Sequence, residues 1–173
     1  MENSKSFNIT VVVNESREKI WDTLYTRFGE TFLFNPNIDG SHFVTGSTGE
    51  VGCERVCNMD SKTFVREKIV KANTQKSFTV DIVGGNMPMV KELKVSFELS
   101  SLKSNQTKVD LLAEFKTKPA FMAGLAKGMF RKKLADVLIG LKYHVETGRT
   151  VSKKTYKPIA KQYKKLQLNQ SFS

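Results

Sequence analysis

Two charged residues, Arg55 and Glu67, face each other in the middle of a mostly apolar surface of a predicted hairpin. The stretch VGCERVCNMDSKTFVREKIV, residues 51–70, has the pattern of two strands joined by a tight turn at Ser61. Because side chains alternate between the two faces of a strand, folding the stretch about that turn puts Arg55 directly opposite Glu67. The residues that share their face are Cys53, Cys57, Met59, Thr63, Val65 and Ile69.

A guanidinium and a carboxylate on an inward face have three uses. They can form a structural ion pair with buried water, hold a polar group of a bound molecule, or act in catalysis, with Arg55 polarising a carbonyl and Glu67 shuttling a proton. Removing two charges from water costs several kcal/mol per ion, so such a pair persists at low cost only where the site is wet or contacts something polar. The pattern therefore predicts that this face lines a cavity. The same register puts Glu54 opposite Lys68 on the outer face.

The chain offers few other groups for chemistry. Its only cysteines, Cys53 and Cys57, lie four residues apart on one strand, about 13 Å, which is too far for a disulfide. We expect both to be reduced and half-buried. The two histidines, His42 and His144, are too scattered for a metal site, so no metal and no cofactor is expected. No local signature supports a Ser–His–Asp arrangement.

Composition and charge favour a single globular domain with a basic tail. The 173 residues are 39% hydrophobic and 26% charged, and no apolar run is long enough for a membrane-spanning helix. The start, MENSKSFNIT, lacks the features of a secretory signal, so a cytoplasmic location is expected. Much of the net charge of +11 comes from residues 149–173, which contain lysines and an arginine but no acid.

A fixed order of elements must position the charged pair. Alternating apolar residues predict a first strand. Helical spacing after the N-cap Ser16 predicts a helix that runs through Phe28 and stops at Gly29, followed by a short second helix broken by Pro36. The remaining strands are joined mostly by short polar turns, which indicates an antiparallel meander. The last element is a long helix at residues 120–147, closed by Gly148. Its apolar stripe consists of Phe130, Leu134, Val137, Leu138, Leu141 and Val145. The seven expected strands are 7–13, 42–46, the two halves of 51–70, 77–83, 90–102 and 107–117.

This order resembles the helix-grip fold of the START/SRPBCC superfamily, and more closely its bacterial polyketide cyclase/dehydrase and lipid-transport type. The supporting segments are ITVVVNESREKIWDTL, VGCERV, VREKI and LADVLIGLKYHVETG, and the resemblance covers about residues 5–148. It implies an α+β fold, in which a curved seven-stranded antiparallel sheet wraps around the long C-terminal helix. Two short helices lie between strands 1 and 2, and a cavity remains between sheet and helix.

The resemblance also assigns the charged pair to that cavity. The Gly-x-x-Arg strand of the family matches Gly52 and Arg55, and its partner-strand glutamate matches Glu67. An access loop at the cavity mouth is implied at Gly84, Gly85, Asn86, Met87 and Pro88, where a plain hairpin turn is the alternative. The candidate ligand-binding residues are Arg55, Cys57, Val65, Glu67, Ile69, Val95, Phe97, Phe115, Met122, Leu125 and Met129. Any of the apolar residues among them could instead fill a core.

The favoured function is binding of a small hydrophobic or amphipathic molecule, as a carrier or sensor. One alternative is a cyclase/dehydratase-like enzyme that uses Arg55 and Glu67 in the same cavity. The expected partner is a hydrophobic or lipid-like ligand, with no nucleic acid, and the chain is expected to be a monomer or homodimer.

The tail supports another alternative, an interaction module that contacts an anionic membrane or nucleic acid. We expect residues 1–148 to form the ligand-binding domain and residues 149–173 to form a basic tail. Ile159, Tyr163 and Leu166 would share one side of a short amphipathic helix in that tail. The helix could dock on the domain, remain solvated, or touch anionic lipid or nucleic acid, where attraction to lipid is about 1 kcal/mol per lysine.

Overall fold

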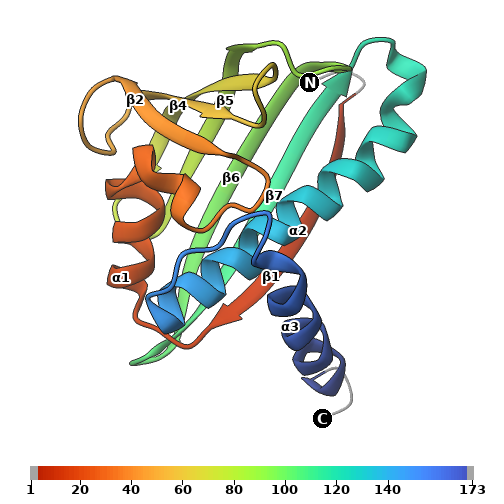
Figure 1. Ribbon diagram of the computed structural model, residues 1–173. Helices are drawn as coiled ribbons and strands as arrows, with labels where there is room; N and C mark the ends of the chain where they lie inside the picture. The colour runs from red at the N-terminus through yellow and green to blue at the C-terminus, as the bar shows by residue number, and fades with distance from the viewer. Residues whose placement is uncertain (1–3, 171–173) are drawn as a thin grey trace.

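A seven-stranded antiparallel sheet curves around one long helix (Figure 1). The computed structural model describes residues 4–170, with side chains described through residue 163. The strands lie in the order β1-β7-β6-β5-β4-β3-β2, so the first and last strands are neighbours. Their bounds are β1 (Lys5–Val13), β2 (Gly40–Thr45), β3 (Glu54–Asn58), β4 (Phe64–Asn73), β5 (Ser77–Gly85), β6 (Val90–Lys103) and β7 (Gln106–Thr117).

Short helical segments connect β1 to β2 at one end of the sheet. Ser16 caps the first of them, because its hydroxyl accepts a hydrogen bond from the backbone N–H of Lys19 at 3.3 Å. The sequence predicted one helix through residue 28, but the α-helical part ends at Trp21 and continues as a π turn and then a 3-10 segment. These segments are α1 (Arg17–Trp21), η1 (Asp22–Thr26) and η2 (Phe28–Leu33).

The predicted hairpin register is confirmed. Arg55 pairs with Glu67 across β3 and β4, and Glu54 pairs with Lys68. The first strand of the hairpin is shorter than expected and begins at Glu54, because the preceding residues turn at Gly52, which has a φ of +99°. The inward face of the hairpin is therefore the one that carries Arg55 and Glu67.

The long helix lies across the concave face of the sheet (Figure 1). It begins with a 3-10 turn, η3 (Ala120–Met122), continues as α2 (Ala123–Thr147), and ends at Gly148 with a φ of +72°. Its buried stripe packs against the sheet in one main core. The predicted members of that stripe that are buried are Phe130, Val137, Leu138, Leu141 and Val145.

The sheet opens between β5 and β6. These strands pair only where residues 77–81 of β5 meet residues 94–98 of β6. Beyond that point the end of β5 pairs with β4 alone, and the start of β6 pairs with β7 alone. The connecting residues 86–89 lie in the resulting gap, close to the first half of α2, and this gap creates the entrance described below.

The tail forms a helix, α3 (Tyr156–Gln170), that packs against α2. Ile159 and Tyr163 are buried together with Ile139 of α2, so docking on the domain is the arrangement that the described part of the tail adopts. The side chain of Leu166 lies outside the described residues. The division of the chain at residue 148 stays a prediction. Among the described residues, no helix combines the length and the apolar character needed to cross a bilayer.

Candidate functional site

The ion pair between Arg55 and Glu67 lies on the inward face of the sheet. The Nε of Arg55 donates a hydrogen bond to Oε2 of Glu67 at 2.6 Å, and the two side chains are only 12% and 18% exposed. If one of the two side chains is removed, few waters can therefore reach the charge that is left, whereas the remaining charge of a surface pair would be hydrated.

Further contacts hold both charges in place. The Nη1 of Arg55 donates to the backbone carbonyl of Phe28 at 2.7 Å, and its guanidinium carbon lies 3.8 Å from the centre of the Phe28 ring. The thiol of Cys57 donates to the same Glu67 oxygen at 3.4 Å. The pair thus joins η2 to the sheet at one point.

The electrostatics of this cluster favour a charged Arg55 and a neutral thiol. Burial alone would lower the pKa of Arg55, but the Glu67 carboxylate outweighs burial and raises that pKa above its ordinary value. Burial, and then the Glu67 charge, raise the pKa of Cys57 well above its ordinary value. Cys57 is therefore a weak hydrogen-bond donor here and not a nucleophile.

Three adjoining hollows run from the gap in the sheet to the ion pair. The first, which we call the mouth pocket, lies beside Met87 and Met129 and has a volume of about 430 Å³. The second, the middle cavity beside Cys57, has about 90 Å³, and the third, the inner cavity beside Arg55, has about 60 Å³. Met87 and Lys133 line both the mouth pocket and the middle cavity, and Leu134 and Val137 line both the middle and inner cavities. Glu67 borders the middle and inner cavities, so its carboxylate stands where they meet.

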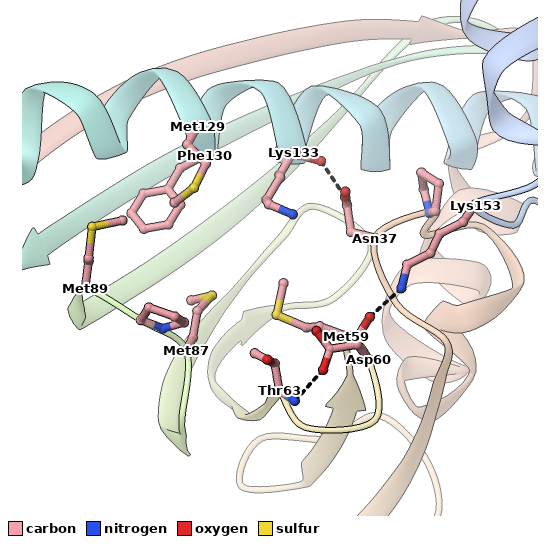
Figure 2. A pocket seen from close by; sticks show the side chains of 12 residues that line it. Asn37, Met59, Asp60, Thr63, Met87, Met89, Met129, Phe130, Lys133 and Lys153 are labelled. Atoms are coloured by element: carbon pink, nitrogen blue, oxygen red, sulfur yellow. Dashed lines mark hydrogen bonds between the residues drawn. The ribbon is translucent and has the colours of Figure 1, made fainter.

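Methionine dominates the apolar lining of the mouth pocket (Figure 2). Met59 comes from the end of the β3–β4 hairpin, Met87 and Met89 from the loop between β5 and β6, and Met129 from α2. These are four of the six methionines in the chain. Thioether side chains are flexible and polarizable, so this lining can adapt to apolar groups of different shapes.

The polar lining of the mouth pocket is mostly engaged within the protein. The ammonium of Lys153 bonds to Asp39 at 2.8 Å and to the backbone carbonyl of Met59, and Asn37 donates to the carbonyl of Lys133 at 2.8 Å. The ammonium of Lys133 differs, because no side chain in the described part of the structure bonds to it. Figure 2 shows it extending from α2 into the pocket.

The inner end of this series is largely filled by aromatic side chains. Phe78 and Phe97 stack at 4.9 Å between ring centres, and both border the inner cavity together with Phe28. The two smaller cavities have room for a few waters or the end of a ligand, and the mouth pocket is the only one of the three with room for the body of a small molecule.

The structure brings most of the predicted site residues to these hollows. Cys57, Val65 and Glu67 line the middle cavity, and Arg55, Val95 and Phe97 join Glu67 at the inner one. The predicted residues that reach the mouth pocket are Met87, Pro88 and Met129.

Other predicted residues lie elsewhere. Ile69 and Phe115 are fully buried in the core and line none of the three hollows. Met122 is partly buried outside them. Leu125 is 69% exposed, so its assignment to the cavity is wrong. It lies on the outer side of α2, whereas its neighbour Ala126 is fully buried in the main core.

The predicted access loop is only partly a loop. Gly84 and Gly85 are the last residues of β5 and border a further hollow, which shares Met87 with the mouth pocket. The side chain of Asn86 accepts from the backbone N–H of Phe64 at 2.9 Å and donates to the carbonyl of Lys62 at 2.7 Å. Met87 and Pro88 are the part of the predicted loop that lines the mouth pocket, and Met89, just beyond the predicted loop, lines it too.

Several residues of the mouth pocket were not identified from the sequence. Asn37, Asp60, Lys133 and Lys153 come from four separate parts of the chain, and no local pattern links them. Met59 had a signal, because the hairpin register already put it on the inward face. Among the described residues, no group of three or more His, Cys, Asp or Glu side chains is placed to hold a metal ion.

Solved structures with the same architecture come from plants and bacteria. Ginseng major latex-like protein 151 from Panax ginseng superposes with a TM-score of 0.65 at 16% identity, covering 82% of this chain and 97% of that one. Ara h 8.0201 gives 0.68 at 15% identity, covering 83% and 99%. The Zhui aromatase/cyclase from Streptomyces sp. R1128 gives 0.70 at 12% identity, covering 83% and 94%.

Similarity to known proteins is therefore structural. No family model and no curated protein sequence matches the chain. Identities of 12–16% establish a shared fold without a shared activity. The fold predicted from the sequence is thus confirmed: the chain has the helix-grip fold.

Proposed function

We propose that the protein binds a small hydrophobic or amphipathic molecule in the mouth pocket, as a carrier or sensor. The observation that carries the proposal is the methionine-lined hollow of about 430 Å³ between the opened sheet and α2. That volume lies within the roughly 300–1,000 Å³ of small-molecule sites, which are mostly apolar with a few polar groups that orient the ligand. The middle cavity would receive the end of the ligand.

The charge in the pocket favours an amphipathic ligand with an acidic group. Lys133 presents an ammonium without a partner among the described side chains, whereas Lys153 is already paired with Asp39. A carboxylate or sulfonate on the ligand would give Lys133 a charge-assisted hydrogen bond while the apolar body contacts the methionines. We therefore propose an anionic group near Lys133 and an apolar chain directed inward.

The geometry favours binding over a cyclase-like reaction. An enzymatic role would need Arg55 to reach a substrate carbonyl, but its guanidinium is bonded to Glu67 and to the carbonyl of Phe28. The adjoining cavities are also too small for the body of a substrate. The pair is better suited to support the inner end of the site than to carry out chemistry.

The geometry also weakens the proposal of an interaction module based on the tail. Ile159 and Tyr163, which would form its apolar contact surface, are buried against α2. The residues that remain exposed on the described part of α3 are Lys157, Pro158, Lys161 and Gln162, which are mostly polar.

A matched pair of substitutions tests the ligand site. The probe is 11-(dansylamino)undecanoic acid, a fluorescent amphipath whose emission rises in an apolar site. Met129→Trp puts a larger side chain into the mouth pocket, and Met122→Trp makes the same change seven residues earlier, outside the hollows. We expect Met129→Trp to weaken probe binding at least about tenfold and Met122→Trp to leave it within about twofold.

Two results would contradict the proposal. One is equal binding by wild type and Met129→Trp with unchanged circular dichroism, since the probe would then bind elsewhere. The other is the absence of saturable binding of both the probe and dodecanoate by the wild-type protein.

A further inference from the structure

The first turns of α2 present large apolar side chains to solvent. Phe121 is 84% exposed and Leu125 is 69% exposed, the two highest values among the large hydrophobic residues of the described chain. A Cβ added at Gly124 or Gly128 would meet no atom within 4 Å, so this side of the helix has no packing partner within the protein. Figure 1 shows this end of α2 extending beyond the sheet.

The same segment is strongly basic. Residues 118–135 contain no acidic residue, and the first carboxylate is that of Asp136. The cations of the segment are Lys118, Lys127, Arg131, Lys132 and Lys133, of which all but the partly buried Lys133 are exposed.

We propose that this end of α2, defined by Phe121, Leu125 and the surrounding cations, docks the protein onto an anionic bilayer surface. Exposed aromatic and aliphatic side chains on a cationic helix are the combination by which interfacial helices bind such surfaces, since the apolar groups enter the acyl boundary and the cations face the headgroups. A nucleic acid would use the cations but offers no apolar phase to Phe121 and Leu125.

Docking in this orientation would bring the mouth pocket close to the lipid. Met129 and Lys133, on the neighbouring side of the same helix, line that pocket. The backbone N–H of Lys118 donates to the carbonyl of Met89 at 3.0 Å, which joins the pocket loop to the start of the helical segment. The surface itself requires no ligand in the pocket, so the inference goes beyond the proposed function and can fail separately.

Sedimentation of the full chain with vesicles tests the apolar contact. Vesicles of phosphatidylcholine and phosphatidylserine at 3:1 should bind the wild-type protein, and pure phosphatidylcholine vesicles should bind it much less. Phe121→Glu/Leu125→Glu should lower the partition coefficient at least about tenfold. Leu102→Glu is the control, because Leu102 is also exposed but lies near the turn at the opposite end of β6.

A second comparison separates this surface from the basic tail. Lys127→Gln/Arg131→Gln and Lys157→Gln/Lys161→Gln each remove two exposed cations, from α2 and α3 respectively. We expect the α2 variant to weaken vesicle binding and the α3 variant to change it less than about twofold.

Three results would overturn the inference. The first is unchanged vesicle binding by the Phe121/Leu125 double variant with a native circular dichroism spectrum. The second is a loss caused only by the α3 variant, which would assign the contact to the tail. The third is binding of duplex DNA that equals vesicle binding and is insensitive to the apolar changes. Binding of the dansyl probe by the same variants reports on the pocket separately.

Discussion

Replacing Glu67 with alanine tests whether the ion pair is enclosed between the sheet and the helical segments. In the native structure Oε2 of Glu67 accepts from Nε of Arg55 at 2.6 Å. After the replacement, Arg55 keeps its bond to the carbonyl of Phe28 and its contact with the Phe28 ring, but it loses its counter-charge.

The expected cost follows from this environment. Removing one partner of a buried pair costs about 3–5 kcal/mol, whereas exposed pairs contribute about 0–1 kcal/mol. Because Arg55 is 12% exposed and keeps its contacts with Phe28, we expect about 3 kcal/mol for Glu67→Ala. Glu67→Gln keeps an acceptor for Nε and should cost about 1.5–2 kcal/mol.

A double replacement separates the pair from its surroundings. Arg55→Met/Glu67→Leu removes both charges and fills similar space, so its free energy of unfolding should lie within about 1–2 kcal/mol of the wild-type value. The control is Glu92→Ala, which breaks a cross-strand contact with Lys116 on the outer face and should cost less than about 1 kcal/mol.

Urea unfolding followed by the fluorescence of Trp21, the only tryptophan, measures all of these changes. Trp21 is buried and stacks on Tyr25 at 4.3 Å between ring centres, so its emission reports on the core. A cost for Glu67→Ala that is no larger than that for Glu92→Ala would show that the pair is solvated, and our account of the inward face would be wrong.

Three further predictions follow from single positions. Lys133→Met should weaken the binding of dodecanoate about fivefold or more and leave the binding of dodecanol unchanged, both measured by displacement of the dansyl probe. Equal effects on the two ligands would show that Lys133 does not recognise an acidic group. Gly140→Ala should destabilise the fold by more than about 2 kcal/mol, because the added Cβ would lie 2.0 Å from the backbone oxygen of Phe34. Gly128→Ala has open space around it and should stabilise α2 by up to about 1 kcal/mol. Thermal unfolding that finds the Gly140 variant more stable than the Gly128 variant would contradict the packing of α2. Burial and the Glu146 carboxylate raise the pKa of Tyr163 to about 12 from 10.0, so the stability that its neutral form provides is intact below pH 10 and lost as pH rises towards 12. Unfolding measured at pH 9–12 should lose less stability in Tyr163→Phe, and parallel curves for the two proteins would refute this assignment.

The features that could be predicted from the sequence depend on local periodicity. A two-residue period and a tight turn were enough to place Arg55 opposite Glu67, because a slip of one residue would have moved the apolar residues of the hairpin to the outer face. Helical spacing similarly identified the stripe of α2 that includes Phe130 and Leu141. These patterns need only the neighbours in the sequence.

The mouth pocket could not be predicted because its position depends on where elements end in space. Leu125 was assigned to the cavity, but it lies about 140° around α2 from Phe130 and therefore on the exposed side of the helix, whereas its neighbour Ala126 is buried in the core. Phe115 was a reasonable cavity residue by its strand face, yet it packs against Phe130 at 5.0 Å between ring centres and fills the core. Lys153 reaches the pocket only because the chain turns back after α2.

Methionine methyl NMR during titration with dodecanoate tests the central claim most directly. With ¹³C-labelled methionine methyl groups, the signals of Met59, Met87, Met89 and Met129 should move together with one dissociation constant, because all four line the mouth pocket. The signal of Met122, outside the pocket, should stay in place. Saturating shifts that involve Met122 but spare the four pocket methionines, or no shift at all, would show that the hollow between the sheet and α2 is not a binding site.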